Sequence, residues 1–191
     1  ACVLCLITGC TSTSNVPPPT IEPTPVVTVQ PTESPTETPV SELTVHFIDV
    51  GQADAAVLQC GDDTMMIDGG NVADSSLIVA YLKKLNIDNI DYMVCTHAHE
   101  DHVGGLSAPL SVMPVSAVYA PSAEADSKAY QNFKRKAADQ NTEIMHPENY
   151  ESFPFGSARV EILACPDNAD NLNNTSIILK VTHKNKSFLF T

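Results

Sequence analysis

Residues 97–102, which are His-Ala-His-Glu-Asp-His, hold three imidazoles and two carboxylates within six positions. Imidazole nitrogen together with carboxylate oxygen suits zinc, manganese or iron. In an extended loop, side chains two positions apart point to the same side. His97 and His99 are therefore predicted to bind one ion, while Asp101 and His102 bind a neighbouring one and Glu100 points to solvent. The alternative interpretation is a solvated polar loop.

The residues on either side of this cluster predict how it is held. Residues 91–96 form a short apolar run that is typical of a buried strand. Ligands at the carboxyl end of such a strand occupy the place where α/β proteins usually put a site. Gly104 and Gly105 follow the last ligand and let the backbone turn sharply.

The remaining pattern predicts two helices and a series of short strands. Asp74 is an expected N-cap, before a helix whose apolar face includes Ile78 and Leu82. A second, more polar helix is expected over 126–140, with Phe133 on a weak apolar face that lies on the outside of the fold. Strands are expected at 43–50, 55–60, 64–67, 91–95, 116–119, 157–164, 176–181 and 187–191. The first three should form an antiparallel meander, and the whole order predicts a mixed α/β (α+β) sandwich with sheets inside and helices outside.

Four segments carry a resemblance to a known family: 45–54, 66–70, 96–105 and 173–176. In type, order and spacing they resemble metallo-β-lactamase-fold hydrolases. Within that superfamily they are most similar to the hydrolase domain of ComEC-type competence proteins and to its free-standing secreted relatives in bacteria. Two positions depart from that subgroup, which often has Gly at position 53 and Asp at position 99, where this chain has Ala53 and His99.

The resemblance implies an αββα sandwich that binds two divalent metal ions, zinc or manganese. It assigns His97, His99, Asp101 and His102 as ligands, and it gives Asp101 a catalytic role in orienting the attacking water. Asp68 is implied to accept a hydrogen bond from a ligand imidazole, although a turn-forming Asp is the alternative.

Two further groups of side chains are implied to lie near the ions. Asp49, Gln52 and Asp54 are placed on the pocket floor, and simple turn chemistry is the alternative for them. Asn173 and Asn174 stand where many relatives have a third His, so they are candidate metal or pocket residues, and a polar loop before a strand is the alternative for them. An amide oxygen suits harder ions, which makes manganese a fair candidate.

The first functional hypothesis is a binuclear metal-dependent hydrolase of the phosphodiesterase or nuclease type, which uses a metal-activated water on DNA or a wall polymer. A second hypothesis is a metallo-hydrolase of a carbonyl substrate, a β-lactam or lactone, and Asn173 in place of a third His argues against it. The third is a non-catalytic metal-binding surface module, and the presence of all four loop ligands argues against that.

The N-terminal region predicts a membrane anchor and a stalk. Residues 7–10 resemble a bacterial lipobox, so 1–10 is expected to be the remnant of a lipoprotein signal peptide, with Cys10 lipidated. The alternatives are a cleaved ordinary signal and an unrelated apolar tail. Residues 11–42, rich in Pro, Thr, Ser and Glu, are expected to be a disordered linker, and 43–191 the hydrolase domain. The expected location is extracytoplasmic, at the bacterial cell membrane.

The domain is expected to be incomplete in this sequence. In the family, the strand that resembles 188–191 runs into Gly-Asp, whose Asp bridges the two ions, and the last His ligand follows later. The resemblance thus implies that the C-terminal part of the domain is missing, that the fragment alone is inactive, and that apolar inner-sheet surface is exposed.

Charge and cysteine content set further limits. The net charge is −13, with four acids and no bases in 1–42 and 19 acids against 10 bases in the remainder. Such an acidic chain repels phosphate polymers, and it has no Trp and no basic–aromatic stripe for nucleic acid. Cys60, Cys95 and Cys165 match no zinc motif, their disulfide status is not readable, and Cys95 is expected to be a small buried residue.

Overall fold

The computed structural model describes residues 41–167 and 170–191, which lie in a compact unit that spans Pro39–Thr191. The predicted signal remnant 1–10 with Cys10, and the predicted linker 11–42 up to residue 40, lie outside the described residues. No helix in the described part is long and apolar enough to cross a membrane.

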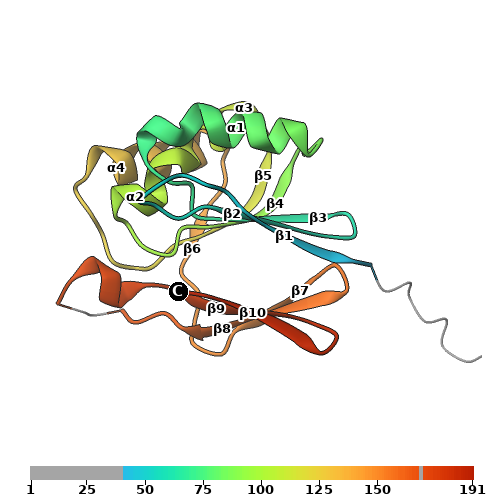
Figure 1. Ribbon diagram of the computed structural model, residues 1–191. Helices are drawn as coiled ribbons and strands as arrows, with labels where there is room; N and C mark the ends of the chain where they lie inside the picture. The colour runs from blue at the N-terminus through green and yellow to red at the C-terminus, as the bar shows by residue number, and fades with distance from the viewer. Residues whose placement is uncertain (1–40, 168–169) are drawn as a thin grey trace, which may run out of the picture. The chain divides into compact units, whose positions relative to one another are not determined.

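A six-stranded mixed sheet forms the centre of this unit (Figure 1). Its strands, in spatial order, are β1 (Leu43–Phe47), β2 (Ala56–Cys60), β3 (Asp63–Ile67), β4 (Ile90–Val94), β5 (Val115–Tyr119) and β6 (Ile144–Met145). The first three pair antiparallel, which confirms the predicted meander, and β3 to β6 pair parallel. The parallel strands carry their carboxyl ends to one edge, where the ligand loop begins.

Helices cover one face of this sheet (Figure 1). They are η1 (Val72–Asp74), α1 (Ser75–Lys84), α2 (Glu100–Val103), η2 (Gly104–Ser107), α3 (Pro109–Val112) and α4 (Lys128–Asp139). Ile78 and Leu82 of α1 are fully buried, as their spacing predicted. The α4 helix covers the sheet as an outer element but buries Tyr130 as well as Phe133, so its apolar face is larger than the sequence indicated.

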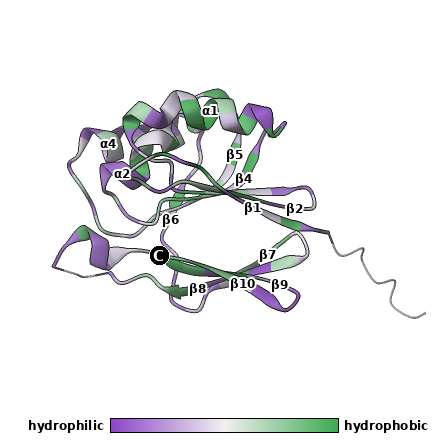
Figure 2. Cartoon of the chain, viewed as in Figure 1, coloured by the Kyte–Doolittle hydropathy of each residue, from purple (hydrophilic) through white to green (hydrophobic). Residues whose placement is uncertain are grey.

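A second, antiparallel sheet lies against the other face of the first (Figure 1). It has the order β10-β9-β8-β7, with β7 (Ser152–Phe155), β8 (Ala158–Ala164), β9 (Ile178–His183) and β10 (Lys186–Phe190), and η3 (Leu172–Thr175) precedes β9. Apolar residues concentrate on the strands, and the β9–β10 turn is hydrophilic (Figure 2). One core lies between helices and the first sheet, and another lies between the two sheets. The predicted mixed α/β sandwich with central sheets is confirmed.

Four local features differ from what the sequence predicted. Residues 97–102 are not one extended loop, because the amides of His102 and Val103 bond to the His99 carbonyl and start the α2 helix. The strand expected at 43–50 ends at Phe47. The β7 strand was missed because it contains Pro154, which is tolerated there since β7 is an edge strand. Asp74 does precede α1, but its carboxylate accepts from the Asn71 amide at 2.8 Å rather than capping the helix.

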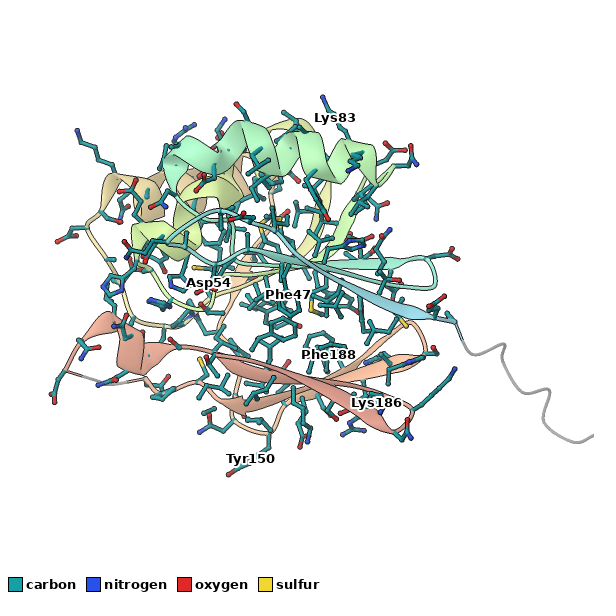
Figure 3. The ribbon with its side chains drawn as sticks, in the orientation of Figure 1. Phe47, Asp54, Lys83, Tyr150, Lys186 and Phe188 are labelled. Carbon is teal, nitrogen blue, oxygen red and sulfur yellow. The ribbon has the colours of Figure 1, made fainter. Side chains whose placement is uncertain are left out.

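Cys60, Cys95 and Cys165 are free thiols and all are buried, which confirms the prediction for Cys95. Burial raises the pKa of the Cys95 thiol well above its ordinary value. Phe47 and Leu189, by contrast, are 69% and 60% exposed, so apolar surface is open at the β1 and β10 edges. Figure 3 shows Phe47 and Phe188 between the two sheets.

The backbone after β3 packs directly on the backbone that follows the ligand loop. A Cβ added to Gly105 would stand 1.9 Å from the Gly69 carbonyl oxygen, and the Gly105 amide bonds to the Gly70 carbonyl at 3.0 Å. Glycine is therefore required at position 105 for space rather than for conformation. Gly51 offers the opposite case, since it has φ +69° but nothing within 4 Å of an added Cβ.

We expect Gly105→Ala to lower the free energy of unfolding by about 2 kcal/mol or more, because two backbone segments must move apart. Gly51→Ala, the matched control, should cost about 1 kcal/mol through its left-handed backbone alone. Urea unfolding of both variants measures the difference. Equal losses would contradict the close packing of the two segments.

Candidate metal centre

Three segments far apart in the sequence meet at the carboxyl ends of β3 and β4. The Asp54 amide bonds to the Asp101 carbonyl at 3.1 Å, and the Gly70 amide bonds to the Asp54 carbonyl at 2.8 Å. The Gly69 amide donates to the His102 carbonyl at 2.7 Å. Main-chain bonds thus hold the loop after β1, the turn after β3 and the ligand segment together before any side chain contributes.

Asp68 is the buried carboxylate at this junction. Its side chain is placed by a left-handed backbone, with φ 56°, and the residue is only 2% exposed. It accepts from the Thr96 amide at 2.8 Å, from the Thr96 hydroxyl at 2.7 Å and from His102 Nδ1 at 2.8 Å. A buried charge is stable only when such donors surround it.

These bonds fix which ring nitrogens face the site. Because His102 Nδ1 lies on Asp68, its Nε2 is the nitrogen left free to bind an ion. The Thr96 hydroxyl donates to Asp68, so its oxygen is left to accept from His97 Nδ1, 3.2 Å away. Nε2 of His97 is then also free. Two imidazoles are oriented through one threonine and one carboxylate.

The three imidazoles lie against one another. The ring centroids of His97 and His102 are 4.0 Å apart, and those of His97 and His99 are 4.9 Å apart. Burial lowers the pKa of His97, and the neighbouring His102 adds to this. Burial also lowers the pKa of His102, but the hydrogen bond and charge of Asp68, with Asp101 and Asp54, outweigh it and raise the pKa overall.

The donor set fits a divalent cation in chemistry and in orientation. Imidazole nitrogens directed outward by hydrogen bonds to a carboxylate and a hydroxyl are a usual arrangement for metal ligands. Within the described residues, however, no three His, Cys, Asp or Glu side chains converge as a finished coordination group. Ion binding therefore requires some of these side chains to move, and His99, Asp101 and His102 are only partly buried.

The remaining ligand candidates lie in α2 and η3. Asp101 is in the first turn of α2, beside His102, and Glu100 is exposed there. Asn173 and Asn174 are exposed in η3, which is tied to the ligand strand by the bond from the Ile177 amide to the Thr96 carbonyl at 2.9 Å. In the described part of the chain, the side chains of these two Asn residues make no hydrogen bond to the ligand segment.

Of the three residues assigned to the pocket floor, one lines a pocket. Asp49 is exposed and accepts from the Gly51 amide at 3.2 Å, which is turn chemistry, and Gln52 is exposed. Asp54 lines a pocket of about 200 Å³ that reaches Asp68 and Thr96. The lining of this pocket also includes the apolar side chains of Phe47, Leu189 and Phe190.

Thr96 is the residue whose part in the site the sequence interpretation missed. Its hydroxyl contacts Asp68 at 2.7 Å and lies 3.2 and 3.4 Å from Nδ1 of His97 and of His102. The available signal was its position, directly between a buried strand and the first ligand. A β-branched residue there looks like the end of the strand, and only the fold brings Asp68 to it.

Comparisons with known proteins bear on the family and the fold of the chain. A family model described as the Metallo-beta-lactamase superfamily matches residues 48–153, which is more than half of the chain and includes the ligand segment. No curated protein matches the sequence.

Solved structures share the fold at low sequence identity. The metallo-beta-lactamase SMB-1 bound to 2-mercaptoethanesulfonate has a TM-score of 0.57 and 19% identity, over 77% of this chain and 60% of that one. A Cronobacter sakazakii metallo-beta-lactamase with a HARLDQ motif gives 0.55 and 18%, over 77% and 58%. The metallo-beta-lactamase fold protein YhfI from Bacillus subtilis gives 0.53 and 15%, over 78% and 61%. The chain spans about six-tenths of the length of each.

The Asp68 carboxylate is predicted to control the titration of His102. In metal-free Asp68→Asn, the His102 pKa should fall, because its strongest hydrogen bond and nearest charge are lost while burial remains. Metal affinity should fall about 10- to 100-fold, as it does when a residue that orients a ligand is removed. Histidine NMR titration and metal titration measure the two effects.

Asp91→Asn is the control, since Asp91 accepts from the Thr64 amide at 2.8 Å and touches no imidazole. An unchanged His102 pKa in Asp68→Asn would show that Asp68 does not hold the ring.

Proposed function

Since the chain belongs to the Metallo-beta-lactamase superfamily, we propose that it acts as a binuclear metal-dependent hydrolase of phosphodiester bonds. One observation carries the proposal. His97 and His102 are both held through Nδ1, by Thr96 and Asp68, so that Nε2 of each is available at the open end of the sheet. Rings that are fixed in this way suit metal ligation better than a solvated loop would.

His97 and His99 would hold one ion, and Asp101 and His102 the other. When bound, two divalent ions lower the pKa of an attacking water to about 7 and offset charge on the substrate. Asp101, partly exposed at the start of α2, would orient the attacking water, accept the proton that this water loses and pass it to the leaving oxygen. Asp68 keeps His102 in one tautomer throughout, and Thr96 does the same for His97.

The phosphodiester class is favoured by the finer resemblance to the ComEC-type hydrolase domain and its secreted relatives, and by Asn173 where many relatives have a third His. Because the net charge of the chain is −13, the bound ions would be the main source of positive charge for an anionic substrate. A carbonyl substrate is the second candidate, because two of the similar structures described above are metallo-beta-lactamases. At 18 and 19% identity, those structures bear on the fold alone.

Metal-loaded full-length protein is expected to hydrolyse bis-p-nitrophenyl phosphate and to leave nitrocefin intact. Chelation should abolish the turnover, and His99→Ala should lower it at least ~100-fold, because losing a ligand costs more than losing a residue that only orients one. His146→Ala is the control, since that imidazole bonds to the Ala120 carbonyl at 2.9 Å and is not in the ligand segment. Turnover of nitrocefin alone, lost in His99→Ala, would transfer the assignment to a carbonyl substrate.

We also propose an extracytoplasmic location for this activity, with Cys10 as the lipidated residue of a bacterial lipoprotein. The support is the sequence Ile-Thr-Gly-Cys at 7–10, followed by a Pro-rich stretch suited to a stalk. Acyl chains on Cys10 would anchor the protein stably, because more than one chain is buried in the bilayer.

Cys10→Ser is expected to move the full-length protein from the membrane fraction to the soluble one and to abolish palmitate labelling. Cys5→Ser, in the same N-terminal segment, should leave both unchanged. Continued palmitate labelling of Cys10→Ser would mean that another residue carries the lipid.

A further inference from the structure

The Asp54 carboxylate lies beside the one free nitrogen of His102. Asp54 Oδ2 is 3.8 Å from His102 Nε2, and its side chain is 75% exposed. The residue belongs to the segment between β1 and β2, at the open edge between the sheets (Figure 3). It lines the same pocket as Asp68 and Thr96, so its carboxylate is accessible to an ion or a small molecule in that pocket.

This distance is too long for a hydrogen bond and suits a shared ion. An N–H···O hydrogen bond extends to about 3.2 Å, which the 3.8 Å separation exceeds. Imidazole nitrogen and carboxylate oxygen each bind zinc at about 2.0–2.2 Å, so two such ligands of one ion stand roughly 3 to 4 Å apart. The second contact of the ring, with Asp68 at 2.8 Å, uses Nδ1 and leaves Nε2 for this purpose.

The main chain holds Asp54 in this place. Its amide bonds to the Asp101 carbonyl at 3.1 Å, and its carbonyl accepts from the Gly70 amide at 2.8 Å. Asp54 is therefore attached to both segments that position His102. Within the described residues no Lys or Arg pairs with Asp54, Asp68 or Asp101, so the cationic group nearest the Asp54 carboxylate is the His102 ring when it is protonated.

We propose that Asp54 supplies a carboxylate ligand to the ion that His102 binds, in addition to Asp101. This inference rests on the proposed function and assigns a residue from outside the His-Ala-His-Glu-Asp-His segment to the metal site. Asp49, in the same loop, has its carboxylate on the Gly51 amide and takes no part.

The test uses Co(II) as the probe, in metal-free full-length protein, with calorimetric titration and the visible spectrum of the bound ion. Asp54→Asn should lower the affinity for the second Co(II) ion at least ~10-fold and alter the visible spectrum of the bound cobalt. The reason is that a carboxylate ligand is replaced by an amide, which is a poor ligand. Asp49→Asn removes the same charge from the same loop and should change neither. Both metal-free variants should have the melting temperature of the wild type, because the backbone hydrogen bonds of Asp54 remain.

Each other outcome has a definite meaning. If Asp54→Asn binds cobalt with the affinity and spectrum of the wild type, Asp54 is not a ligand, and the proposed function stands. An equal loss of affinity in both variants, with unchanged spectra, would reduce Asp54 to a long-range charge effect and overturn the inference. Wild-type protein that binds no cobalt would overturn the proposed function itself.

Discussion

The buried carboxylate of Asp68 is the interaction on which the rest of the site depends. An ionised side chain that is 2% exposed is costly unless donors surround it, and Asp68 has three, from Thr96 and His102. The same bonds fix the end of β3 against the end of β4 and set the tautomer of His102. The hydrogen bonds that stabilise the buried Asp68 charge are thus the same bonds that orient the His102 ring, so a change in one changes the other.

The loops around Asp68 are joined by backbone rather than by side-chain packing. Gly69, Gly70 and Gly105 bring the turn after β3 into main-chain contact with the ligand segment, and Asp54 joins from the loop after β1. This close contact collects the carboxylates of Asp54, Asp68 and Asp101 around His102. Negative charge assembled at an open sheet edge favours a cation, and a bound cation in turn makes an anionic substrate acceptable to an acidic protein.

Local patterns predicted much of this structure. Alternating and apolar runs gave β2, β4, β8 and β9, and the spacing of Ile78 and Leu82 gave α1. The clustered histidines and Asp68 were identified from residue types and from the family resemblance, and the family model supports the same superfamily.

What the sequence could not provide are features created by contact between distant segments. The first turn of α2 forms in a stretch that alone favours an extended loop, and it is held there by the Gly69 and Asp54 amides. Thr96 and Asp54 are ordinary strand-end and turn residues until β3 and the first loop bring partners to them. Tyr130 is buried only because α4 lies across the core, and Pro154 is allowed only because β7 is an edge strand.

The most direct measurement is anomalous diffraction from crystals of the full-length protein grown with zinc or manganese, collected at the absorption edge of that metal. Two peaks are expected among His97, His99, Asp101 and His102, with Nδ1 of His102 still on Asp68. Absence of any peak at this cluster under saturating metal, with peaks elsewhere or none at all, would contradict a metal centre built on the Asp68 carboxylate.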